Sequence, residues 1–131
     1  MIGVDTNVLI RLLAPDHEKQ NTAARSFFSA RSPDDPAYVS SIVLAETIWL
    51  LRRRLGYSRT AVEDAVRSML ASDDFHIEHG ERLSALLKQG TPRAEIADYL
   101  IAWSADVAGC LSTVTFDKRS AKSIPSMELL A

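Results

Sequence analysis

The chain has 131 residues, of which 47% are hydrophobic and 24% are charged, as in a globular protein with a core of its own. Its net charge of −2 neither demands nor excludes a polyanionic partner. No apolar run approaches the roughly 18 residues that cross a bilayer, no signal-peptide pattern is present, and Cys110 has no second cysteine to pair with. We therefore expect a single domain over residues 1–131, without a membrane segment and in the cytoplasm.

Predicted strands and helices alternate along the chain. In order, they are a strand at residues 2–5, helices at 7–13 (ended by Pro15) and 18–30, a strand at 37–39, helices at 41–55 and 59–70, a strand at 75–77, helices at 81–88 and about 92–109, a strand at 111–114, a helix at 118–122 and a strand at 127–130. Crossover connections of this kind predict an α/β fold, with a central, mainly parallel twisted sheet flanked by helices on both faces.

Four acidic residues stand in strongly apolar segments. Asp5 and Asp117 each follow a predicted strand, whereas Glu46 and Asp98 lie within predicted helices. A buried carboxylate without compensation costs several kcal/mol, so four in one small chain suggest a shared cation. Ligands of parallel sheets bind beyond the carboxyl ends of the strands, which is where Asp5 and Asp117 are expected.

A hard divalent ion fits such a group of carboxylates. If neighbouring carboxylates lie about 5 Å apart, each pair repels by roughly 3 kcal/mol at an effective dielectric of about 20. Oxygen ligands favour Mg²⁺ or Mn²⁺, which can activate a water and neutralise charge at a phosphodiester. The nearest histidine in sequence, His17, is too far along the chain to suggest zinc. Asn7 and Thr115 are placed to support the site.

The segments around the four acids resemble PIN-domain ribonucleases, and most of all VapC-type toxins of bacterial toxin–antitoxin systems. The matching segments are residues 4–9, 44–46, 97–102 and 113–117. The resemblance implies a PIN-like fold over the whole chain and a Mg²⁺ or Mn²⁺ site that cleaves RNA with a metal-activated water. The acids that would form this site are Asp5, Glu46, Asp98 and Asp117, with Asn7 and Thr115 in support. It also implies a homodimer inhibited by a cognate antitoxin.

Each acid also has a plainer interpretation. Asp5 and Asp117 can cap the helices that follow them, and Asp98 can form an internal ion pair. Glu46 can extend from a partly exposed helix face or pair with an arginine such as Arg53. Two other functions remain open: a haloacid-dehalogenase-like phosphatase, which also has an Asp after its first strand, and a PIN module that only binds protein. The phosphatase would need a second Asp where this chain has Asn7.

Basic and aromatic residues give weaker signals. Arg52, Arg53 and Arg54 are expected to be a solvated helix end, whereas Lys118, Arg119 and Lys122 closely follow Asp117 and are better candidates for contacts to the RNA backbone. We expect His76 and His79 on the surface, Trp49 and Trp103 in the core or an interface, and Cys110 buried. The apolar residues 48–51 and 62–70 predict a surface for the antitoxin.

Overall fold

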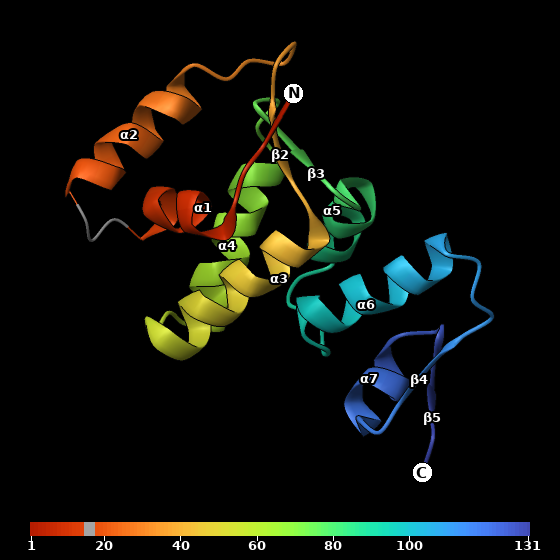
Figure 1. Cartoon of the computed structure of the whole chain (residues 1–131). Helices are drawn as coiled ribbons and strands as arrows, with labels where there is room; N and C mark the ends of the chain where they lie inside the picture. The colour runs from red at the N-terminus through yellow and green to blue at the C-terminus, as the bar shows by residue number, and fades with distance from the viewer. Residues whose placement is uncertain (15–17) are drawn as a thin grey trace. The chain divides into compact units, whose positions relative to one another are not determined.

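The computed structural model describes residues 1–14 and 18–131 (Figure 1). Its elements are β1 (Ile2–Gly3), α1 (Thr6–Leu13), α2 (Glu18–Ser29), β2 (Ala37–Val39), α3 (Ser41–Trp49), the π-helical segment η1 (Leu50–Arg54), α4 (Arg59–Leu70), β3 (Phe75–Ile77), α5 (Gly80–Lys88), α6 (Ile96–Val107), β4 (Thr113–Thr115), α7 (Lys118–Ser123) and β5 (Met127–Leu129).

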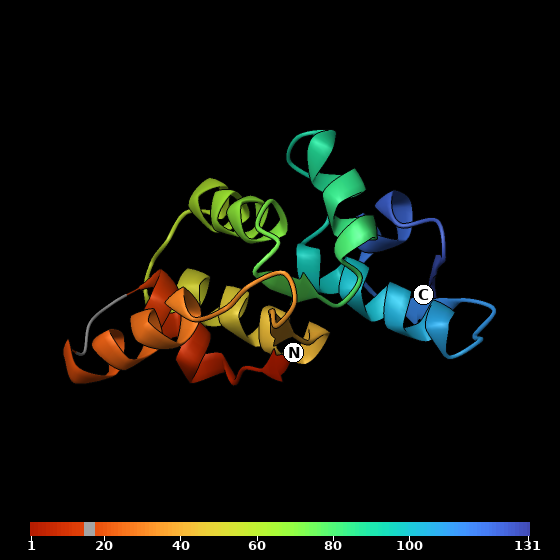
Figure 2. The same cartoon turned by 90° about the horizontal axis from the view of Figure 1, so that it is seen from above.

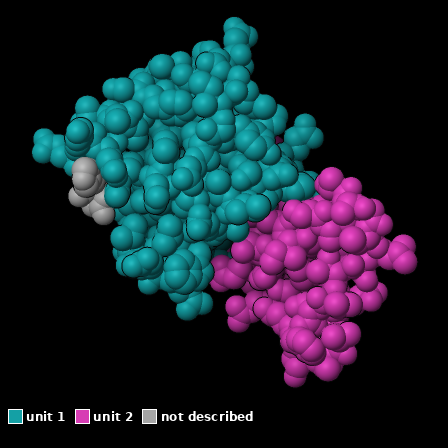
Figure 3. All heavy atoms as spheres, viewed as in Figure 1, with its two compact units in different colours: residues 1–87 teal, residues 88–131 magenta. Residues whose placement is uncertain are grey.

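The described residues form two compact units, residues 1–87 and residues 88–131 (Figure 3). In the first unit, β2 pairs in parallel with both β1 and β3, in the order β1-β2-β3. In the second unit, β4 pairs in parallel with β5. The expected α/β class with parallel strands is confirmed, and the backbone hydrogen bonds divide the described strands between two sheets.

Helix α1 packs against both α2 and α3 in the first unit. Figure 2 shows α2 running beside α1, with α3 next to them. Leu9 of α1 and Leu44 of α3 are fully buried, as is Val39 of β2. These side chains fix the short helix α1 between its two neighbours, so the residues at its start are held at the carboxyl end of β1.

Helix α3 continues through the wider turn η1, so the predicted helix over 41–55 has an α-helical and a π-helical part. Ser40 caps its start, because the Ser40 hydroxyl accepts a hydrogen bond from the Val43 N–H. Gly56, at a φ of +73°, takes the left-handed conformation that ends the helix, and the Tyr57 N–H donates to the Leu51 carbonyl.

The predicted start of the sixth helix is wrong. We expected Pro92 near its first turn, but Glu95 is in an extended conformation and the helix begins only at Ile96. Pro92 and Ala94 are buried in the irregular segment before it, so packing decides this boundary rather than the helix-starting tendency of proline. The predicted role of Pro15 in ending the first helix lies outside the described residues.

Burial limits the apolar surface of residues 48–51 and 62–70, because Ile48, Leu51, Val62 and Val66 are buried, whereas Trp49 is 56% exposed. An antitoxin surface on these segments stays a prediction. The prediction that Cys110 is buried is wrong, since Cys110 lies exposed in the turn after α6, where Gly109 has a φ of +91°. Over the described ranges, no helix is long and apolar enough to span a membrane.

Candidate active site

Asp5 lies just beyond β1 and is the N-cap of α1. Its backbone is extended, and its Oδ1 accepts a hydrogen bond of 2.7 Å from the Thr6 N–H. The carboxylate is exposed, and its Oδ2 takes no part in that bond. Asp5 therefore combines a structural role as helix cap with a carboxylate oxygen that remains available to a ligand.

Thr6 connects Asp5 to the second predicted acid. The Thr6 hydroxyl donates a hydrogen bond to Oε1 of Glu46, which lies on α3. Thr6 is only 4% exposed, whereas Glu46 is on the exposed side of its helix. Because Thr6 directly follows Asp5, this bond holds the Glu46 carboxylate next to the turn that carries Asp5. Among the described residues, Glu46 forms no ion pair with Arg53, so that alternative is wrong.

Glu78 fixes the start of the helix that carries Glu46. It directly follows β3, and its Oε1 accepts a hydrogen bond of 2.7 Å from the Ser41 N–H in the first turn of α3. This backbone hydrogen bond from Ser41 holds the pKa of Glu78 below its ordinary value. Glu78 is not among the predicted site residues, although it is an acid directly after a strand, the same signal that singled out Asp5.

Asp117 caps α7 in the second unit. Its Oδ1 accepts hydrogen bonds from the backbone N–H groups of Arg119 at 2.8 Å and Ser120 at 3.1 Å. The Ser120 hydrogen bond, followed by that from Arg119, keeps the pKa of Asp117 below its ordinary value. The side chain is exposed, and its Oδ2 is outside both bonds. The predicted cap role of Asp117 is thus confirmed.

Thr115 and Asp98 complete the predicted set in the second unit. The Thr115 hydroxyl oxygen accepts a hydrogen bond of 3.0 Å from the Asp117 N–H, so Thr115 supports Asp117 through its backbone. Asp98 lies in the first turn of α6 and is half-buried. In the described part of the chain Asp98 forms no ion pair, so the alternative of an internal salt bridge is wrong.

The premise that these acids are buried is wrong. Asp5, Glu46 and Asp117 are exposed, and so are Val114 and Phe116 beside Asp117. In α3, Leu44 and Ile48 point into the core while Glu46 points outward. Burial alone therefore does not require a cation at these residues.

The donor set nevertheless fits a hard divalent ion. Every predicted ligand is a carboxylate, and Asp5 and Asp117 each keep an oxygen outside their cap bonds. Within either unit, the described residues contain no group of three His, Cys, Asp or Glu side chains that would hold a metal ion. Asp5 and Glu46 belong to the first unit, and Asp98 and Asp117 to the second, so convergence of all four stays a prediction.

A comparison with protein-family models matches residues 2–124 to the PIN domain. The chain belongs to the PIN domain family. No curated protein sequence matches the chain. PIN domains are generally nucleases that use divalent metal ions such as Mg²⁺, which supports a hydrolase that acts on nucleic acid rather than a phosphatase.

The basic residues near Asp117 remain available to a polyanion in this PIN domain. Lys118, Arg119 and Lys122 are all exposed on α7. Of the three arginines of η1, Arg53 and Arg54 are exposed at the helix end, as expected for a solvated terminus.

The aromatic and histidine predictions have mixed outcomes. Trp49 is 56% exposed and therefore is not a core residue, whereas Trp103 is half-buried against Tyr99, with ring centroids 5.7 Å apart. His76 is on the surface, as expected, where it stacks on Tyr38 at 5.8 Å, and His79 is half-buried.

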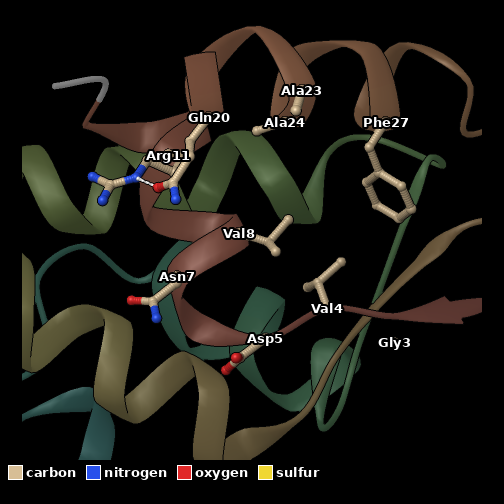
Figure 4. Close-up of a pocket in the computed structure, with 10 residues that line it drawn as sticks. All are labelled: Gly3, Val4, Asp5, Asn7, Val8, Arg11, Gln20, Ala23, Ala24 and Phe27. Atoms are coloured by element: carbon tan, nitrogen blue, oxygen red, sulfur yellow. Dashed lines mark hydrogen bonds between the residues drawn. The ribbon is translucent and has the colours of Figure 1, made fainter. Parts of the chain in front are cut away.

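A pocket of about 540 Å³ adjoins Asp5 in the first unit of the PIN domain (Figure 4). It lies between α1 and α2, and both Asp5 and Asn7 contribute to its lining. The side chains of Val4 and Val8 face the helix α2, from which Phe27 extends toward them (Figure 4). The predicted supporting residue Asn7 therefore shares a cavity wall with Asp5.

Proposed function

We propose that this PIN domain is a Mg²⁺-dependent endoribonuclease and the toxin of a type II toxin–antitoxin pair. The observation that supports the proposal most is the hydrogen bond from the Thr6 hydroxyl to Glu46, because Thr6 directly follows Asp5 and itself donates its N–H to the Asp5 carboxylate. Mn²⁺ would serve in place of Mg²⁺, since both are hard ions with the same preference for carboxylate oxygen.

The proposed metal ligands are Asp5, Glu46, Asp98 and Asp117. A bound ion would activate a water and neutralise charge at the phosphodiester. The residues of the chain orient the ligands: the Thr6 hydroxyl holds Glu46, the N–H groups at the start of α7 hold Asp117, and Glu78 holds the start of α3. Lys118, Arg119 and Lys122 would bind phosphates of the RNA backbone.

We further propose that the protein acts as a homodimer in the cytoplasm and is inhibited by an antitoxin. Support for the homodimer comes from α3, where Ile42 is 80% and Trp49 is 56% exposed. Large exposed apolar side chains on one helix are typical of a protein contact surface. Sedimentation analysis of wild type and Trp49→Glu tests this: a dimer that the substitution leaves unchanged would contradict the assignment of this surface.

A circular single-stranded RNA tests the proposed activity, because it has no ends and only an endonuclease opens it. We expect the purified protein to linearise the circle with Mg²⁺ and not with excess EDTA. A DNA circle of the same sequence is the control for the choice of nucleic acid. Intact RNA circles in the presence of Mg²⁺ or Mn²⁺ would contradict the proposal.

The toxin role needs a separate experiment in cells. We expect induction of the wild-type protein to arrest growth and co-expression of the antitoxin to relieve the arrest. The matched control is Asp5→Asn, which removes a proposed ligand while an asparagine still caps α1. Growth arrest by a folded Asp5→Asn protein would mean that toxicity does not depend on cleavage.

A further inference from the structure

The pocket between α1 and α2 is mostly apolar, but it ends at polar groups. Its apolar wall consists of side chains from the start of the chain and from α2: Val4, Val8, Ala23, Ala24 and Phe27. Four polar residues line the same cavity: Asp5, Asn7, Arg11 and Gln20. The Arg11 guanidinium donates a hydrogen bond of 2.7 Å to the Gln20 side chain (Figure 4). A volume of about 540 Å³ is in the range of small-ligand sites, so a flat group of the size of a nucleobase has room to enter.

Asn7 offers hydrogen bonds that nothing in the described part of the chain uses. Its side chain is exposed and its amide has no hydrogen-bond partner among the described residues. An amide presents both donors and an acceptor in one plane, which suits the polar edge of a base. Asn7 is also two residues from Asp5, so a group bound by Asn7 would lie beside the proposed metal ligand.

Phe27 supplies an aromatic surface that is already held in place. The Arg31 guanidinium lies over its ring, 4.4 Å from the centroid, and Phe28 packs edge-on against it at 5.1 Å. Figure 4 shows the ring of Phe27 extending from α2 toward Val4. A ring fixed in this way is a suitable surface for a base, because little side-chain freedom is lost on stacking.

We propose that this pocket receives one nucleobase of single-stranded RNA, next to the phosphodiester that is cleaved. The inference rests on the proposed function and adds a substrate-binding position to it. The base would pack against Phe27 and the apolar wall, and its polar edge would meet the Asn7 amide. The enzyme would then recognise unpaired RNA, since a base within a duplex is not free to enter.

A nucleobase accounts for this pocket better than an apolar side chain of a partner protein does. A base can both accept from the exposed Asn7 amide and donate to it, whereas an apolar side chain would form no hydrogen bond with it. The pocket is also continuous with Asp5, so its occupant is placed beside the reacting phosphate.

Filling the pocket from an exposed position tests the inference without disturbing the core. Ala23 is exposed and lines the pocket, so Ala23→Phe would occupy the space of the base. Thr22→Phe is the matched control, because Thr22 is also exposed on α2 but is not part of the pocket wall. Equal free energies of unfolding for the two variants would confirm that neither substitution alters the fold.

The probes are short single-stranded RNAs in which one base at a time, around the cut, is removed to leave an abasic site. With wild type and Thr22→Phe, we expect one abasic position to lower kcat/KM by about ten-fold. With Ala23→Phe, we expect intact RNA to be cleaved about ten-fold more slowly and removal of that base to have no further effect. Equal cleavage of intact RNA by Ala23→Phe and Thr22→Phe would overturn the inference.

A measurement of binding to the same RNAs tests the base pocket independently of the proposed cleavage activity. Fluorescence anisotropy with Ca²⁺ in place of Mg²⁺ measures affinity without a cleavage step. If wild type binds RNA but does not cut it, the nuclease proposal fails, while a weaker affinity of Ala23→Phe than of Thr22→Phe still supports the base pocket. Normal RNA binding by Ala23→Phe, with loss of the antitoxin on co-purification, would assign the pocket to a protein and overturn the inference.

Discussion

The Thr6 hydroxyl donates a hydrogen bond to the Glu46 carboxylate across 40 positions of sequence. This contact joins the first turn of α1 to the middle of α3, and it does so one residue after Asp5. The carboxylates of Asp5 and Glu46 are far apart in the sequence, and this contact holds them on adjoining helices. A buried hydroxyl that orients a carboxylate ligand is typical of the support that metal sites need.

Removal of this hydroxyl is expected to weaken both the site and the fold. Thr6→Val keeps the shape of the side chain but leaves Glu46 without its hydrogen bond, so we expect cleavage to fall by about ten-fold. The free energy of unfolding should fall by about 1 kcal/mol. Thr6→Ser, which keeps a hydroxyl, should recover most of both values. Wild-type cleavage by Thr6→Val would show that Glu46 needs no such support.

The two roles of Asp5 can be separated by two substitutions. Asp5→Ala removes the cap of α1 as well as the proposed ligand, so we expect a loss of about 1 kcal/mol in the free energy of unfolding. Asp5→Asn keeps the cap and should be nearly as stable as wild type. Both variants should cleave RNA at least about 100-fold more slowly, because neither has the charged ligand. Denaturant titration and cleavage assays check the two expectations independently.

Glu78 should make the stability of the protein depend on pH in acid. Its pKa is lowered in the folded protein by the hydrogen bond from Ser41, so its contribution is fully present above the ordinary value of 4.5. That contribution is lost as the pH falls through the lower folded pKa. Glu78→Gln should flatten the dependence of Tm on pH below the ordinary pKa of 4.5. Identical pH profiles for wild type and Glu78→Gln would contradict the role of Glu78 in holding α3.

The exposed basic residues of α7 should contribute to RNA affinity through charge. For Lys122→Ala we expect the slope of log K against log salt to fall in magnitude by about 0.7, the value for one single-strand phosphate contact. Arg54→Ala is the matched control, because Arg54 is exposed at the end of η1 and is expected to be only solvated. An unchanged slope for Lys122→Ala would remove α7 from the RNA-binding surface.

Local sequence signals predict most of the elements but not all of their boundaries. The strands at 37–39 and 75–77 are correct to the residue, since turn-forming residues border short runs rich in apolar residues. The start of α6 was misplaced because the packing of Pro92 and Ala94 prevails over the preference of proline for a first helical turn. Such packing depends on residues far along the chain.

The features of the candidate site are likewise only partly predictable from the sequence. The positions of Asp5 and Asp117 just beyond strands, and their cap roles, follow from the sequence because both depend on near neighbours. The exposure of Glu46 and its bond to Thr6 could not be predicted in this way. Both depend on which face of α3 meets the core and on how α1 packs against it.

The proposed metal site depends on the carboxylates of Asp5 and Asp117, and a calorimetric titration with Mn²⁺ tests this dependence most directly. Wild type is compared with Asp5→Asn from the first unit and Asp117→Asn from the second, both of which keep a capping side chain. We predict Mn²⁺ binding to wild type and an affinity at least about ten-fold weaker in each variant. Wild-type affinity in either variant would contradict the proposed role of that carboxylate as a metal ligand.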